Sequence, residues 1–167
     1  MSDETLLAAL AQAIPGFSEE YTAVPVVDER QGEYKQLYWL DALLGERYLC
    51  YVEWKEFDPW GVDGLNALAP VQQAGISLST DSLYDEQGFP VQDISREAFL
   101  YDAGGFYLPV LQQQLQQAGL QLLEVGMLQR DGNVYLHENP RFICVITEQS
   151  KIEQLNLQLQ PRGLVLC

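Results

Sequence analysis

RYLCYVEWKEFDPWGVDGLNAL, residues 47–68, is the stretch that decides the fold. Its first half is rich in β-branched and aromatic residues between Gly45 and Asp58, which predicts a central strand over residues 48–55. Its second half predicts a helix, because Asp58 can cap the free N–H groups of a first turn and Pro59 suits the first helical position. We therefore expect a strand, a turn and a capped helix in succession.

Length and composition predict one folded domain over residues 1–167. Apolar residues make up 47% of the chain, enough to bury a core without a disulfide or a metal. Three widely spaced cysteines without a Cys-x-x-Cys motif are typical of reduced thiols in a cytoplasm. The acidic N-terminus lacks the basic region of a signal peptide, and no apolar run approaches the length of a membrane span. We therefore expect a cytoplasmic protein with no membrane partner.

The formal net charge of −15 restricts the partners of the protein. Binding the phosphates of nucleic acid requires a cationic surface, so no nucleic-acid partner is expected. The charge is compatible with a surface that docks on a basic protein. It is also compatible with acidity that only keeps the protein soluble. The charge therefore argues against a nucleic-acid partner and does not choose between a basic protein partner and simple solubility.

The periodicity of the rest of the chain predicts a single α+β domain, with a mixed, mostly antiparallel sheet of about five strands and helices packed on it. Helices are expected over residues 3–14, 33–44, 58–68 and 106–117, with a hairpin arm as the alternative for 33–44. Further strands are expected over residues 22–27, 76–78, 120–128, 134–138, 142–147 and 155–160, the last with a helix as its alternative. Apart from a short helical turn expected over residues 94–100, residues 79–101 match no clear element, and they form either a functional loop or regular structure that this pattern does not reveal.

Glu53 and Lys55 form the only pattern that resembles a catalytic motif. Side chains two apart on a strand point the same way, as in the (Asp/Glu)-x-Lys half of a metal-dependent nuclease signature. Asp41 lies at a plausible distance upstream to supply the second carboxylate. The simpler interpretation is an ion pair between Glu53 and Lys55 at the rim of the sheet. A second hypothesis from the same stretch is a divalent-metal site on Glu53, Glu56 and Asp58, although Asp58 also has the simpler role of a helix cap.

The aromatic residues of this region are candidates for binding. Trp54, Trp60, Tyr51 and Phe57 lie within ten positions of one another. Buried, they would form core; exposed, they would anchor a partner or line a ligand cleft.

The segment Tyr51-Val52-Glu53-Trp54-Lys55-Glu56-Phe57-Asp58, with Leu65 and Leu68 in the helix after it, resembles a family of uncharacterised small bacterial cytoplasmic proteins, a domain of unknown function. The later helix, strand and apolar strand ending at Val145 are similar in layout. The resemblance implies a compact α+β domain and brings no activity with it.

Two functions follow from these observations. The first is a non-enzymatic, acidic interaction protein of a bacterial cytoplasm, of an immunity type or a regulatory type, with a basic protein as its partner and no cofactor. The alternative is a divalent-metal phosphodiesterase or nuclease that uses Glu53 and Lys55. The sequence leaves the oligomeric state open.

Overall fold

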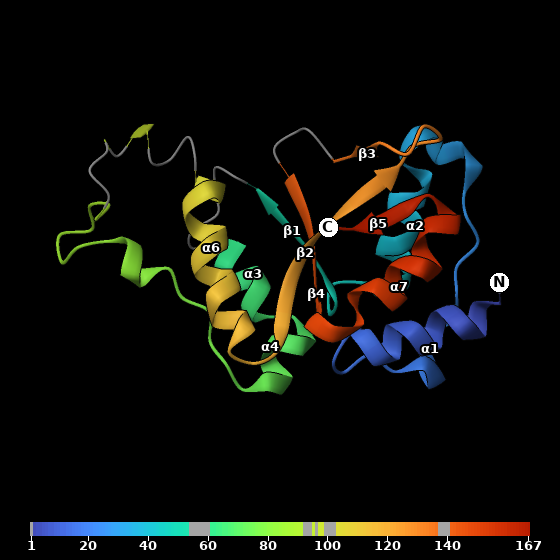
Figure 1. Cartoon of the computed structure of the whole chain (residues 1–167), viewed down its shortest axis with the longest axis horizontal. Coiled ribbons are helices and arrows are strands. Elements are labelled where there is room, and N and C mark those ends of the chain that lie inside the picture. The colour runs from blue at the N-terminus through green and yellow to red at the C-terminus, as the bar shows by residue number, and fades with distance from the viewer. Residues whose placement is uncertain (1, 54–60, 92–94, 96, 99–102, 137–140) are drawn as a thin grey trace.

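The computed structural model describes residues 2–53, 61–91, 95, 97–98, 103–136 and 141–167. It has the predicted α+β fold, with helices and an antiparallel sheet mixed along the chain (Figure 1). The described α-helices are α1 (Asp3–Ala13), α2 (Lys35–Leu44), α3 (Val62–Asn66), α4 (Ala69–Ala74), α6 (Ala103–Gln116) and α7 (Ile152–Leu159). The strands are β1 (Leu49–Glu53), β2 (Leu120–Leu128), β3 (Val134–Tyr135), β4 (Arg141–Glu148) and β5 (Leu164–Leu166). Short 3₁₀ helices connect them at Glu19–Tyr21, Glu29–Tyr34, Asp81–Leu83, Gln149–Lys151 and Gln160–Arg162.

β2 is the strand around which the sheet is built. Its first part pairs with β4, with Leu120 opposite Glu148, and its last part pairs with both β3 and β5. β1 pairs with β4 alone among the described strands, in the order β1-β4-β2. The strand predicted over residues 48–55 is present as β1, but the prediction that it is central is wrong, because β1 is at the edge of the described strands. β4 comes late in the chain and inserts between β1 and β2, a placement that local sequence does not encode.

Helices cover both faces of the sheet, and two hydrophobic cores result. Neighbouring residues of a strand point to opposite faces, so Leu123 and Leu122 enter different cores, as do Val145 and Ile146. Core 1 lies under α1, α2 and α7. Core 2 lies under α3, α4 and α6 (Figure 1). β1 also serves both cores, through Leu49 in core 1 and Val52 in core 2.

Four side-chain amides each bond both backbone groups of one residue, as a neighbouring strand would. Gln112 bonds Leu122, and Gln114 bonds Ser79. Asn66 bonds Leu78, and Asn156 bonds Leu166. A buried backbone group needs a partner. These amides therefore satisfy backbone groups that no strand reaches, and the glutamine-rich face of α6 has a structural role.

Three predicted strands are absent from the described residues. Residues 22–28 pair with no strand, although the Pro25 carbonyl accepts from Nε1 of Trp39 at 2.8 Å, and Val26 is 92% exposed. Residues 76–78 are also unpaired, because the Asn66 amide occupies the backbone of Leu78. Residues 155–160 belong mostly to α7, where Leu155 and Leu159 reach core 1 at helical spacing. The helix predicted over residues 33–44 is confirmed as α2, and the one over residues 3–14 as α1.

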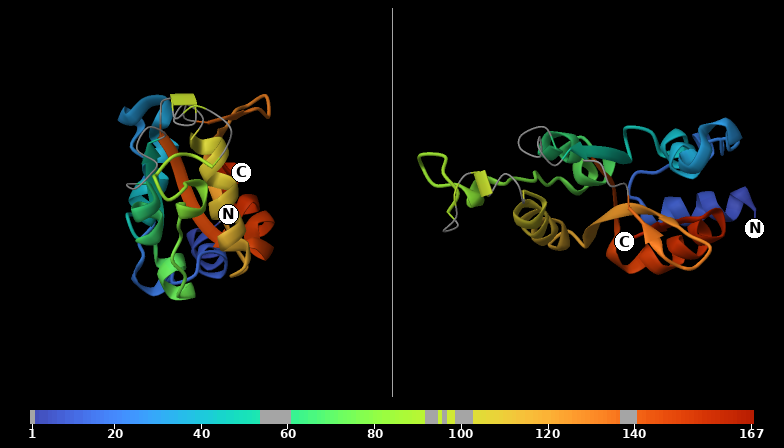
Figure 2. Two further views of the ribbon diagram at one scale, coloured as in Figure 1. Left: turned by 90° about the vertical axis from the view of Figure 1, so that its left-hand side faces the viewer. Right: turned by 90° about the horizontal axis from the view of Figure 1, so that it is seen from above.

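Residues 79–91 form an arm that projects beyond α6, away from the sheet (Figures 1 and 2). Their backbone is ordered by a 3₁₀ turn at Asp81–Leu83 and by an antiparallel bridge between Tyr84 and Pro90. The sequence indicated a segment without regular structure here, and the arm has little. Hydrogen bonds from backbone N–H groups to the Asp85 carboxylate add to this order.

Candidate functional site

A tight turn brings the end of α2 beside β1. Gly45 follows α2 with a φ of 63°, a conformation that favours glycine, and its N–H donates to the Asp41 carbonyl at 2.8 Å. The Gly45 carbonyl then accepts from the N–H groups of Tyr48 and Leu49, at 3.2 and 3.0 Å. The chain therefore reverses direction within a few residues, and β1 starts close to the helix that precedes it.

The reversal places Tyr51 next to Asp41. The Tyr51 hydroxyl is hydrogen-bonded to the Asp41 carboxylate. Burial raises the pKa of the Asp41 carboxyl above its usual value, the hydrogen bond from Tyr51 opposes that shift, and the nearby charge of Glu46 adds to it. Asp41 is therefore partly desolvated, and a cation placed beside it would stabilise the charged form of its carboxylate.

Tyr38 extends this site along α2. It lies three residues before Asp41, so both side chains lie on the same face of the helix. The Tyr38 side chain is 48% exposed and that of Tyr51 is 42% exposed. We call Tyr38, Asp41, Glu46 and Tyr51 the tyrosine surface. It presents two phenol rings and two carboxylates, and its backbone is fixed by core 1 through Leu37 and Leu40.

The structure brings together only some of the residues predicted from the sequence. Tyr51 is exposed, as the binding hypothesis requires, and Asp41 contacts it. The other candidates, Trp54, Lys55, Glu56, Phe57, Asp58 and Trp60, lie outside the described residues, as does the side chain of Glu53. The catalytic and metal hypotheses therefore stay predictions. In the part of the chain that the structure describes, no group of three or more His, Cys, Asp or Glu residues could hold a metal ion.

The sequence prediction left out two residues of the tyrosine surface, Glu46 and the second tyrosine, Tyr38. The sequence signal for Tyr38 is its spacing of three residues from Asp41, which places both on one face once residues 33–44 are known to be a helix. The alternative of a hairpin arm for this segment would have placed the two side chains on opposite faces.

The described cysteines do not form a reactive site. Burial raises the pKa of the Cys50 thiol to about 11. Burial and the charge of Glu124 raise that of Cys167, the last residue. A thiol is nucleophilic as the thiolate, which both environments disfavour. Cys50 instead packs against core 2, where its Sγ would lie only 2.8 Å from a Cβ atom at position 64, so that glycine suits this position.

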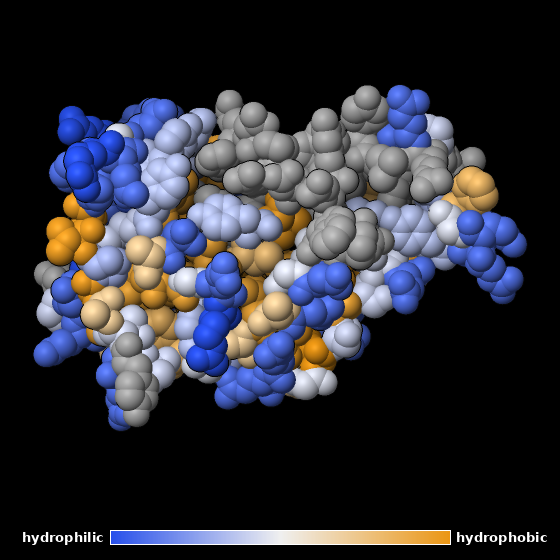
Figure 3. Space-filling view, turned by 180° about the vertical axis from the view of Figure 1, so that it is seen from behind, coloured by the Kyte–Doolittle hydropathy of each residue, from blue (hydrophilic) through white to orange (hydrophobic). Residues whose placement is uncertain are grey.

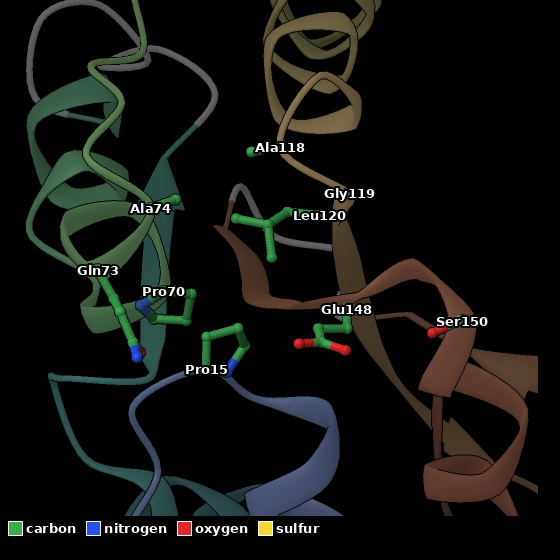
Figure 4. Close-up of a pocket in the computed structure, with 9 residues that line it drawn as sticks. All are labelled: Pro15, Pro70, Gln73, Ala74, Ala118, Gly119, Leu120, Glu148 and Ser150. Carbon is green, nitrogen blue, oxygen red and sulfur yellow. The ribbon is translucent and has the colours of Figure 1, made fainter.

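A cleft of about 480 Å³ opens at the end of the β2–β4 pair, between α4 and the segments that follow α1 and β4 (Figure 4). Pro15 and Pro70 form one wall, and the Glu148 carboxylate faces them from the other. Glu148 is the one ionisable side chain among the described lining residues. A single carboxylate supplies neither the acid–base pair of most hydrolases nor the several oxygen ligands that a hard cation takes.

The described residues contain no helix long and apolar enough to cross a membrane. The fold and the tyrosine surface define an acidic α+β protein, whose antiparallel sheet lies between two layers of helices. The chain belongs to the family described as domain of unknown function DUF6630, whose model matches residues 2–127. Searches of curated proteins and of solved structures found no match. The family match ends within β2, so β3, β4, α7 and β5 complete the sheet and core 1 from outside the matched segment.

Proposed function

We propose that the protein is a non-enzymatic interaction protein of a bacterial cytoplasm, of an immunity or regulatory type, that binds a basic protein through the tyrosine surface. The observation that carries this proposal is the pairing of Tyr51 with Asp41, which holds an exposed ring against a partly buried carboxylate. Exposed tyrosines are among the residues most enriched at protein interfaces. A ring already held in place loses little conformational entropy on binding.

The electrostatics of the tyrosine surface support a basic partner. Asp41 is partly desolvated, and a Lys or Arg side chain beside it would favour the charged form and lower its pKa. Binding would then release a proton, so affinity should rise as the pH rises through the pKa of free Asp41. The net charge of −15 would speed the encounter with a basic protein, most strongly at low salt.

Affinity capture with matched variants tests this proposal. Wild-type protein, Tyr51→Ala and Leu157→Ala are immobilised and exposed to the same bacterial extract. Leu157 is 63% exposed on α7 and serves as the control for loss of an exposed apolar side chain. We expect a basic protein that wild type and Leu157→Ala retain and that Tyr51→Ala loses, with retention falling as salt rises. Equal retention by Tyr51→Ala, or an acidic ligand, would contradict the proposal.

The alternative function is metal-dependent phosphodiester hydrolysis by Glu53, Lys55 and Asp41. One observation favours it: Asp41 is hydrogen-bonded to Tyr51, which precedes Glu53 by two positions in the sequence of β1. Calorimetric titration with Mg²⁺ and Mn²⁺ decides it. Binding that Glu53→Ala abolishes would support hydrolysis, and no heat of binding at millimolar metal would end the hypothesis.

A further inference from the structure

The base of the arm, residues 79–91, is fixed to the body of the protein. The Asn66 amide accepts from the Leu78 N–H at 2.7 Å and donates to its carbonyl at 2.9 Å. The Gln114 amide bonds the N–H and carbonyl of Ser79 at 2.9 and 2.7 Å. Leu83 is buried in core 2, and the hydroxyls of Tyr84 and Tyr107 are hydrogen-bonded. The arm therefore leaves the body in one defined direction.

The tip of the arm is ordered as well. Oδ1 of Asp85 accepts from the N–H groups of Gln87 and Phe89, both at 2.9 Å. The Asp85 N–H donates to the Phe89 carbonyl at 2.8 Å, and the Val91 N–H donates to the Leu83 carbonyl at 3.0 Å. Turns closed by an aspartate side chain in this way hold a defined backbone. The tip is a small hairpin and not a loose loop.

This ordered tip displays apolar side chains that the protein itself does not bury. Phe89 and Val91 are each 55% exposed. Figure 3 shows the arm at the right-hand end of the molecule, where apolar surface (orange) lies beside hydrophilic side chains (blue). A single exposed apolar residue needs no explanation. A phenylalanine and a valine two positions apart, on a hairpin fixed at base and tip, form a pre-organised anchor of the kind that fills a pocket on a partner.

The charge around the tip identifies the chemistry of that partner. No Lys, Arg or His occurs between Lys55 and Arg96 in the sequence, whereas the arm carries Asp81, Asp85 and Glu86. An anionic lipid surface or a nucleic acid would repel such a tip. A second copy of the chain, with its own charge of −15, would also repel it. A protein with basic surface complements it.

We propose that the arm is a docking element that places Phe89 and Val91 in an apolar pocket of a protein whose surrounding surface is basic. This inference goes beyond the tyrosine surface, because it uses other residues on the opposite side of the sheet. The two can fail separately.

Site-specific photo-crosslinking tests the arm directly. The photoreactive residue p-benzoylphenylalanine replaces Phe89 in one full-length variant and Leu157 in a control variant of similar exposure. After irradiation in bacterial cells, we expect position 89 to give an adduct with one basic protein that position 157 does not give. No specific adduct at position 89, an adduct with a second copy, or an adduct with an acidic protein would overturn the proposal.

Binding measurements with the crosslinked protein, purified, complete the test. Phe89→Ser and Val91→Ser should each weaken the complex about tenfold, since both remove an anchor and leave the Asp85 turn in place. Leu157→Ser should leave it unchanged, and unchanged melting temperatures show that each variant is folded. Unchanged affinity for both arm variants, or Phe89-dependent binding to vesicles of anionic lipid, would refute the arm proposal. If Tyr51→Ala alone weakens the complex, the arm is wrong and the tyrosine surface stands.

Discussion

The interactions on the two sides of the sheet hold different parts of the chain in place. On the core 1 side, Arg162 of the C-terminal segment lies 4.9 Å over the Trp39 ring and pairs with Asp3 of α1 at 2.9 Å. On the core 2 side, the amides of Asn66 and Gln114 bond the backbone at the base of the arm. Core 1 thus joins both ends of the chain to the sheet, whereas core 2 supports a projecting hairpin. Each side thus carries one proposed binding surface, the tyrosine surface beside core 1 and the arm beside core 2, and core 1 in addition holds the two ends of the chain together.

The largest expected effects come from opening either core. Leu10 in core 1 is 1% exposed and Leu111 in core 2 is 0% exposed. Leu10→Ala and Leu111→Ala should each lower the free energy of unfolding by about 2–5 kcal/mol, because each leaves a cavity. Denaturant unfolding followed by circular dichroism measures this. If the shared sheet couples the two cores, both variants unfold in one transition, and two separate transitions in either would show that the sides are independent.

Replacing an amide tests the difference between the two sides. Asn66→Ala and Asn156→Ala each leave a buried backbone N–H and carbonyl unpartnered, and each should cost about 1–3 kcal/mol of stability. The two variants should differ in the region of the backbone that loses protection from hydrogen exchange. Hydrogen exchange should rise over residues 79–91 in Asn66→Ala and over Leu164–Leu166 in Asn156→Ala. Unchanged exchange in the arm of Asn66→Ala would show that the amide does not fix it.

Asp41→Asn tests the electrostatics of the tyrosine surface through the pH dependence of stability. The folded protein raises the pKa of Asp41 above 3.8, so it holds this proton more tightly than the unfolded chain. Stability should therefore fall as the pH rises from 3.8 through the raised pKa, and Asp41→Asn should remove part of that fall. Thermal melting across this range is the measurement. An identical pH profile in the variant would contradict the burial of Asp41.

The smallest expected effect separates the two tyrosines. Tyr51→Phe removes the hydrogen bond to Asp41 and should cost up to about 1 kcal/mol of stability. Tyr38→Phe changes an exposed hydroxyl for which no interaction with Asp41 is described, and its melting temperature should stay close to that of wild type. Equal destabilisation by both changes would show that Tyr51 is not specially held.

Local patterns in the sequence predicted much of the fold. The apolar spacing in residues 35–44 and 106–116 predicted helices that the structure has, and Ser2 caps α1 by accepting from the Thr5 N–H. The order of the strands could not be predicted from these local patterns, because β4 inserts between β1 and β2 through contacts between residues far apart in the chain. The sequence pattern of residues 76–78 predicts a strand. In the structure, the backbone of Leu78 pairs with the side-chain amide of Asn66 and not with another strand.

The site was predictable in part. Tyr51 was identified as a binding candidate because it lies in an aromatic cluster, and Asp41 because of its place before Glu53. Their contact could not be predicted, since it depends on the turn at Gly45 that returns β1 to α2. The arm tip at Phe89 gave no sequence signal beyond an irregular acidic segment, because its order comes from the carboxylate of Asp85.

The most direct test of the proposed function is the dissociation constant of the captured basic partner, measured by calorimetry with purified proteins. The complex should weaken at least about tenfold when Tyr51→Ala replaces wild type, and should be unchanged in Leu157→Ala. The wild-type affinity should also fall as salt rises, because opposite charges meet in the complex. A Tyr51→Ala complex as tight as that of wild type would contradict the assignment of the tyrosine surface as the binding site.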